Sequence, residues 1–71
     1  MTAQEHKDIS LTYQERSIVR MIADGAKTAG IAEAMGLKPE TVKWYRKRIL
    51  DKFQASTSAE VVRMAIEMKL I

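Results

Sequence analysis

Residues 31–53 read IAEAMGLKPETVKWYRKRILDKF, and they contain the clearest structural pattern of the chain. Apolar residues recur at helical spacing up to Gly36, where a positive φ lets the chain turn without a Cβ clash. Pro39 suits the first position of a new helix, because its missing amide hydrogen has no helical partner there. The stretch therefore predicts helices at 28–35 and 39–53 joined by a short glycine turn, which is a helix-turn-helix.

Two capping boxes predict the remaining helices. In T-Y-Q-E at 12–15 and T-S-A-E at 57–60, the Thr hydroxyl accepts from the third amide and the Glu reaches back to the Thr amide. Helices are expected at about 12–24 and 57–69, and Thr28 is expected to cap the second helix. Since no segment alternates with period 2, the prediction is an all-α four-helix bundle.

The composition describes one small domain, with 71 residues and 46% of them apolar. We expect a disordered lead-in or linker remnant at 1–10 and the folded domain at 11–71. No apolar run is long enough to span a membrane, and no signal peptide is visible, so we expect a cytoplasmic protein. With no Cys, one His (His6) and no phosphate loop, we expect no metal, cofactor, small-molecule ligand or enzymatic activity.

Positive charge is concentrated in residues 38–52. This segment has six basic and two acidic side chains, a net +4, whereas the whole chain is +3, so the other 56 residues sum to −1. Such a concentration is typical of a protein that binds a polyanion, although a solvated helix face also produces it.

The helix expected at 39–53 has an apolar face and a basic face. At 100° per residue, Val42, Ile49 and Phe53 lie together, and Tyr45 flanks them as a core-boundary residue with its hydroxyl at the surface. Arg46 lies near this inner stripe, so its guanidinium is expected to reach outward to solvent or phosphate. The opposite side carries Lys43, Trp44, Lys47, Arg48 and Asp51.

Trp44 is the unusual residue of the outward side. An exposed Trp forgoes about 2–3 kcal/mol of burial, so we expect it to contact a partner, for example a thymine methyl in the DNA major groove. The alternative is that the indole folds back over Thr41, Arg48 or the turn, with a cation–π contact.

From Leu11 to Ile71 the chain resembles the LuxR-type helix-turn-helix domain of bacterial transcription factors. The resemblance rests on L-T-x-x-E at 11–15, Gly25, I-A at 31–32, G-L at 36–37, T-V-K at 41–43, I-L at 49–50 and A-E-V-V-x-x-A at 59–65. It implies a four-helix domain whose third helix enters the major groove of double-stranded DNA and whose fourth commonly mediates dimerisation. It also implies a bacterial cytoplasmic protein that lies on the nucleoid when bound.

Carried over by position, the resemblance implies base contacts from Lys43, Trp44 and Lys47. At 27–30 the chain has K-T-A-G where relatives often have S-N-K-E, so the phosphate contacts there fall to other groups. The residues expected to contact phosphates are Lys27, Thr28, Lys38, Thr41, Arg46 and Arg48.

The helix expected at 57–69 has two apolar stripes. One consists of Val61, Met64, Ala65 and Met68, and the other of Val62 and Ile66, about 100–140° away. If the first stripe faces the core, the second is free to form a homodimer on DNA. The alternative is that helix 1, Leu70 and Ile71 cover both stripes.

The function expected is that of a sequence-specific DNA-binding domain, the C-terminal output domain of a two-component response regulator. RNA polymerase is the further partner that such a role implies. The alternatives are a free-standing short LuxR-type regulator and a basic helical module that binds an acidic protein. RNA is a lesser rival, because an α-helix does not fit the narrow major groove of A-form duplexes.

Overall fold

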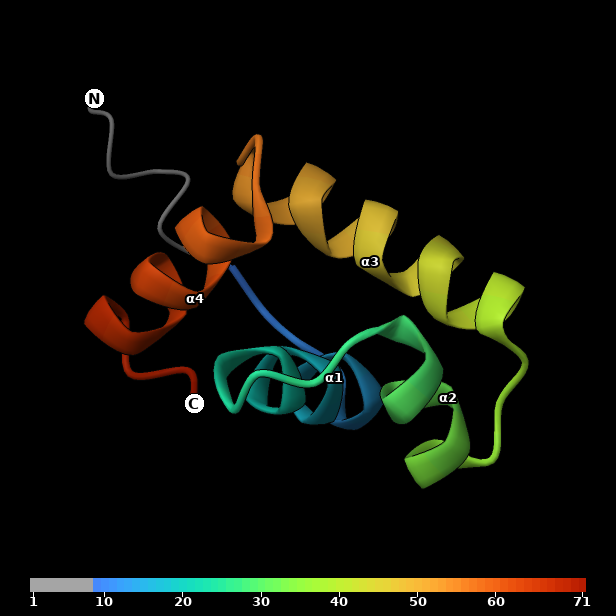
Figure 1. Ribbon diagram of the computed structural model, residues 1–71. Helices are drawn as coiled ribbons and strands as arrows, with labels where there is room; N and C mark the ends of the chain where they lie inside the picture. Colours follow the sequence, from blue (N-terminus) through green and yellow to red (C-terminus); the bar gives the residue numbers. More distant parts are fainter. Residues whose placement is uncertain (1–8) are drawn as a thin grey trace.

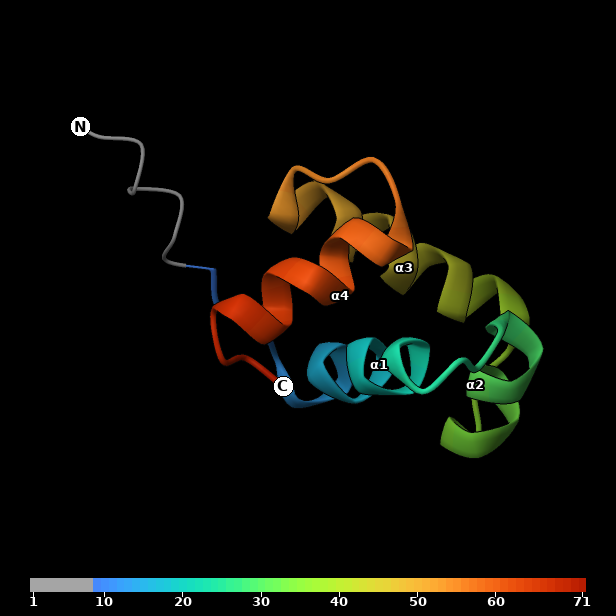
Figure 2. The same ribbon diagram turned by 60° about the vertical axis from the view of Figure 1, so that its left-hand side comes forward.

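The computed structural model describes residues 9–71, which form four helices and no strand (Figures 1 and 2). Residues 1–8 of the lead-in expected at 1–10 lie outside the described residues. Ile9, within the same expected lead-in, packs against the hydrophobic core. The all-α prediction is confirmed. The helices are α1 (Tyr13–Ala23), α2 (Thr28–Met35), α3 (Pro39–Phe53) and α4 (Ser58–Glu67).

The caps of α1 and α4 explain why both helices begin one residue later than expected. Thr12 is an extended N-cap whose hydroxyl accepts from the Glu15 amide at 3.1 Å, and its own amide donates to Glu15 Oε1 at 2.9 Å. Thr57 likewise caps α4, accepting from the Glu60 amide at 3.1 Å. The Glu60 carboxylate, however, accepts from the Ser56 amide at 2.8 Å, one residue earlier than a capping box requires.

The expected cap of α2 was wrong. Lys27 is the extended N-cap and makes no side-chain capping bond, while Thr28 is already the first helical residue. The Thr28 hydroxyl accepts instead from Arg46 of α3 at 3.2 Å. This hydroxyl thus joins α2 to α3 rather than satisfying an amide of its own helix.

The turn of the helix-turn-helix is built as the sequence predicts. Gly36 ends α2 with φ +69°, and the Leu37 amide donates to the Ala32 carbonyl at 2.9 Å. Leu37 is partly buried against the core beneath the turn. Pro39 then opens α3 as its first residue.

The core lies among all four helices and leaves one side of α3 free. In Figure 1, α3 runs along one edge of the molecule, with α1 and α2 on its inner side. Helix α2 packs chiefly on α3, and α4 chiefly on α1, which Figure 2 shows from the side. The buried apolar residues are Ile18, Val19, Ile31, Ala32, Val42, Ile49, Phe53, Val61 and Ala65.

Candidate nucleic-acid interface

The outward face of α3 carries the basic side chains. Lys43, Lys47 and Arg48 are exposed, whereas Val42 and Ile49 of the same helix are at most 2% exposed. The two faces therefore separate as the helical period predicts. The position of this face on the second helix of the helix-turn-helix makes it the candidate interface.

Trp44 is exposed within this face and also contacts its neighbours. Trp44 is 56% exposed, and the guanidinium carbon of Arg48 lies 5.4 Å from the centroid of its ring. The Tyr45 ring meets it edge-on, with centroids 5.1 Å apart and an interplanar angle of 77°. The cation–π contact of the second interpretation is present but leaves Trp44 more than half exposed, and contact with a partner stays a prediction.

Tyr45 lies at the core boundary, as expected. It is half-buried, and its hydroxyl donates to Gln14 Oε1 of α1 at 2.7 Å. This bond ties the aromatic pair of α3 to the first turn of α1.

Glu15 is a buried carboxylate that joins α1 to α3. It is 1% exposed and accepts from Lys52 Nζ at 2.7 Å and from Arg48 Nε at 3.1 Å. Burial raises the pKa of this carboxyl. The hydrogen bonds from Lys52, the Thr12 amide and Arg48, together with the Lys52 charge, outweigh it and leave the pKa below its ordinary value.

From the sequence, Glu15 was assigned only a capping role, and these partners were missed. A signal was present, because Glu15 lies at helical spacing from Ile18, Val19 and Ile22 on the apolar stripe of α1. A buried carboxylate on such a stripe requires cationic partners, and α3 supplies two.

Arg46 is held between the N-termini of α2 and α4. Its guanidinium donates to Thr28 Oγ1 at 3.2 Å and to Ser58 Oγ at 2.9 Å, and the residue is half-buried. A guanidinium has five N–H donors, so these two bonds leave others for a further acceptor. The expected phosphate contact at Arg46 is therefore compatible with a structural role.

The other expected phosphate contacts lie at helix N-termini. Lys27 and Lys38 are the exposed N-caps of α2 and α3, and Thr41 is half-buried in the first turn of α3. Both ends carry a cation at the positive end of a helix dipole, which is where anions are favoured.

Helix α4 separates its stripes in part. Val61 and Ala65 are buried, Val62 is half-buried and Ile66 is 58% exposed. Leu70 and Ile71 pack against the core without covering Ile66. The second stripe is thus partly open to solvent.

Comparison with known proteins decides the family. Residues 9–65 match the model of the bacterial regulatory proteins of the luxR family. The chain belongs to the luxR family. This family is one of regulatory proteins and is not an enzyme class.

Several curated luxR-type regulators align with the chain. The tetrathionate response regulatory protein TtrR of Salmonella typhimurium is 40% identical over 53 residues, covering 75% of this chain and 26% of that protein. The transcriptional regulatory protein FixJ of Azorhizobium caulinodans is 34% identical over 56 residues, covering 79% of this chain and 26% of that protein. The DNA-binding transcriptional activator EvgA of Escherichia coli is 31% identical over 70 residues, covering 99% of this chain and 34% of that protein. The chain therefore spans only about a quarter to a third of these relatives.

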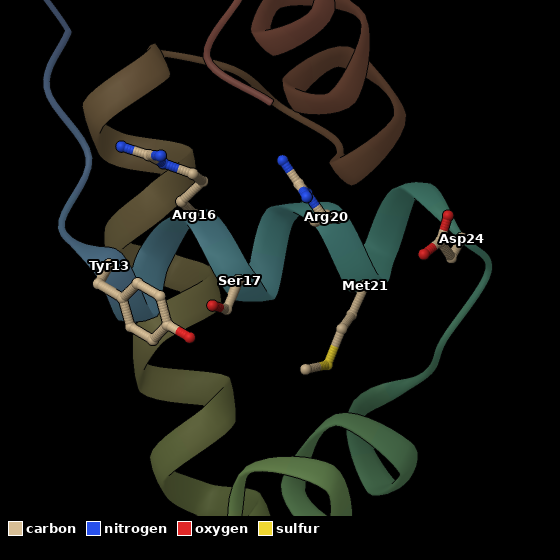
Figure 3. Close-up of a pocket in the computed structure, with 6 residues that line it drawn as sticks. All are labelled: Tyr13, Arg16, Ser17, Arg20, Met21 and Asp24. Atoms are coloured by element: carbon tan, nitrogen blue, oxygen red, sulfur yellow. The ribbon is translucent and has the colours of Figure 1, made fainter.

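Shallow hollows lie on several helices of this luxR-family domain, and two of them show where the candidate interface is. One, of about 330 Å³, lies on α3 beside Trp44 and is lined by Lys47, Arg48 and Asp51. The other, of about 380 Å³, lies along α1 and contains none of the residues expected to contact DNA (Figure 3). Of these two, the hollow on α3 is the one that belongs to the candidate interface.

In residues 9–71 no helix is long and apolar enough to cross a membrane.

Proposed function

We propose that this luxR-family domain binds double-stranded DNA sequence-specifically with α3 in the major groove. The observation that carries the proposal is the exposed face of α3, where Lys43, Trp44 and Lys47 project from the second helix of the helix-turn-helix. An α-helix fits the major groove of B-DNA, and a second helix of this motif is the one that enters it.

The residues of α3 take different roles in this proposal. Lys43 and Lys47 donate to guanine O6 and N7, and the indole of Trp44 contacts apolar features of the base edges. The phosphate contacts come from side chains around this face, which hold the helix in register without reading sequence. They are Lys27, Thr28, Lys38, Thr41, Arg46 and Arg48.

In the full-length protein, we infer that this domain is the output domain of a response regulator. The support is that TtrR is named a response regulatory protein and aligns through a segment of only 26% of its length. A free-standing short regulator is the alternative. The sequence of the gene upstream of residue 1 separates the two, because a response regulator requires a receiver domain there.

The main test has two steps. The chain first selects a duplex from a randomised DNA library, and its affinity for that duplex is then measured. Replacing Lys43 and Lys47 together by Ala is expected to weaken binding by about 1–3 kcal/mol for each base that α3 then fails to read. A matched variant, with Arg20 and Lys69 replaced by Ala, removes the same charge from exposed positions outside α3. Fluorescence anisotropy of a labelled duplex measures affinity, and circular dichroism checks the fold.

Three outcomes would contradict the proposal. If both double variants lose the same affinity, the attraction is one of net charge alone. If a duplex RNA of the same sequence binds as well as DNA, major-groove reading by α3 is excluded. A chain that enriches no duplex, but binds an acidic protein, supports the interaction-module alternative.

We further propose that two copies pair on DNA through α4. Ile66 is 58% exposed and Val62 half-buried on one side of this helix. A two-fold dimer through this stripe would place two α3 helices on an inverted-repeat site about one helical turn apart.

A further inference from the structure

The indole of Trp44 is exposed but is held on two sides. The Arg48 guanidinium lies 5.4 Å from its centroid, and the Tyr45 ring meets it edge-on at 5.1 Å. An exposed side chain without neighbours would sample several rotamers. These two contacts instead favour one orientation of the ring on the outer face of α3.

Both neighbours of Trp44 are tied to adjacent residues in the first turn of α1. The Tyr45 hydroxyl donates to Gln14 Oε1 at 2.7 Å, and Arg48 Nε donates to Glu15 Oε2 at 3.1 Å. Glu15 is itself fixed, because it is 1% exposed and accepts from the Thr12 amide and Lys52 as well. A closed set of contacts thus runs from α1, through both neighbours, to the indole.

We propose that Gln14 and Glu15 are positioning residues which, through Tyr45 and Arg48, hold the Trp44 indole ready to contact the 5-methyl group of a thymine. The inference rests on the proposed function, since it assumes α3 in the major groove. Neither positioning residue touches DNA in this proposal. Their effect is to order the indole before binding, and ordering one side chain corresponds to about a 2- to 12-fold change in affinity.

The thymine methyl is the partner that the chemistry of this position favours. Trp44 is the one aromatic residue of α3 that is more than half exposed, and Lys47, Arg48 and Asp51 surround the shallow hollow beside it. These polar neighbours suit hydrogen-bonding base edges, whereas the indole face does not. Among the groups at the major-groove edge, the thymine methyl is the apolar one.

The test replaces thymines by uracil, one at a time, in the duplex enriched by the 71-residue chain. This change removes only the methyl group. Burying one methyl against the indole corresponds to about a fourfold change in affinity, so we expect about a fourfold loss at the contacted thymine. In Trp44→Ala, the same replacement is expected to have no effect.

Three variants then address the positioning residues. Gln14→Ala and Tyr45→Phe each break the bond between the two side chains, and Glu15→Gln weakens the hold on Arg48. In each, we expect the thymine-to-uracil ratio of affinities to fall toward one. Tyr13→Phe is the matched control, because Tyr13 is 82% exposed on α1 at the hollow of Figure 3 and contacts no member of the set by a hydrogen bond among the described residues.

A second readout uses the free protein and needs no DNA. Trp44 is the single Trp, so time-resolved fluorescence anisotropy reports its local rotation alone. The fast local component is expected to grow in Tyr45→Phe and Glu15→Gln, and to stay unchanged in Tyr13→Phe.

The outcomes separate the inference from the proposed function. If the chain binds DNA but the ratio is the same in all variants, or the indole rotates equally in all, the positioning role is overturned while DNA binding stands. If the chain enriches no duplex, the proposed function fails, and this inference fails with it.

Discussion

Replacing Glu15 by glutamine removes one charge from a carboxylate that is 1% exposed and accepts from two cations of α3. Glutamine keeps an oxygen for the Thr12 amide and Lys52, but its NH₂ group replaces the oxygen that accepts from Arg48 Nε. The side chain keeps its size, so no cavity is created. The change therefore isolates the charge–charge and charge-assisted part of the link between α1 and α3.

The expected loss follows from the exposure of the partners. A hydrogen bond to a charged group contributes about 1.5–3 kcal/mol, and breaking a fully buried ion pair costs about 3–5 kcal/mol. The side chains of Lys52 and Arg48 are 27% and 51% exposed, so water solvates both cations once the carboxylate is gone. We therefore expect the free energy of unfolding to fall by about 1.5–3 kcal/mol, the range for a hydrogen bond to a charged group. A domain of this size has roughly 4–10 kcal/mol of stability, so the variant stays folded at 25 °C.

The loss must depend on pH in a defined direction. Because the pKa of Glu15 in the fold lies below the ordinary value of 4.5, its charge stabilises the fold fully above that value. As the pH falls below 4.5 and through the lowered pKa, this stabilisation disappears. The difference in unfolding free energy between the parent and Glu15→Gln is thus constant near neutral pH and shrinks in acid.

Urea unfolding followed by circular dichroism measures this difference across the pH range. Glu67→Gln is the matched control, because it makes the same change in an exposed pair with Arg63, which contributes at most about 0.5 kcal/mol. Equal unfolding midpoints for the parent and Glu15→Gln near neutral pH would refute the stabilising role. A difference that grows in acid would refute the assigned direction of the pKa.

Two further predictions concern the turn and α4. Gly36→Ala is expected to destabilise the fold by about 1–2 kcal/mol, because φ is +69° at this position. Gly30→Ala is expected to stabilise it by up to about 1 kcal/mol, because Ala is the better helix former inside α2. No atom lies within 4 Å of either added Cβ, so thermal unfolding of the two variants compares backbone effects alone. Ile66→Glu is expected to convert a two-to-one complex on an inverted-repeat duplex into a one-to-one complex in analytical ultracentrifugation, and a parent chain that binds such a duplex strictly one-to-one would contradict pairing through α4.

Patterns within a single helix predicted most of this fold. The capping box at Thr12, the positive φ of Gly36 and the two faces of α3 each depend on residues close together in sequence. The bounds 28–35 predicted for α2 agree with the structure, and only its cap was misassigned, because the N-cap is Lys27 and not Thr28. The Thr28 hydroxyl instead accepts from Arg46, which is 18 residues away in sequence and could not be paired with it from local patterns.

Patterns within a single helix could not predict the contacts between the candidate interface and α1. Glu15 and Lys52 are separated by 37 residues, and Gln14 and Tyr45 by 31. No helical period relates such positions, since the packing angle of α1 on α3 decides which side chains meet. The outward direction of Trp44 was predictable, whereas the α1 residues that hold its neighbours were not.

These contacts also change what the basic segment 38–52 implies. Of its six cations, Arg48 and Lys52 pair with Glu15, and Arg46 bonds Thr28 and Ser58. Within residues 9–71, Lys38, Lys43 and Lys47 make no ion pair, and Lys27 adds a fourth such cation. Each neutralised phosphate contributes about −0.9 to the log–log slope of affinity against salt. With Lys43 and Lys47 on bases, Lys27 and Lys38 give about −1.8 per chain, and phosphate contacts from Arg46 and Arg48 raise the slope to about −3.6. A measured slope near the smaller value would mean that both arginines stay with their partners in the fold and contact no phosphate. A slope near the larger value would mean that both reach phosphate, and an Arg48 drawn away from Glu15 would no longer position Trp44 in the complex.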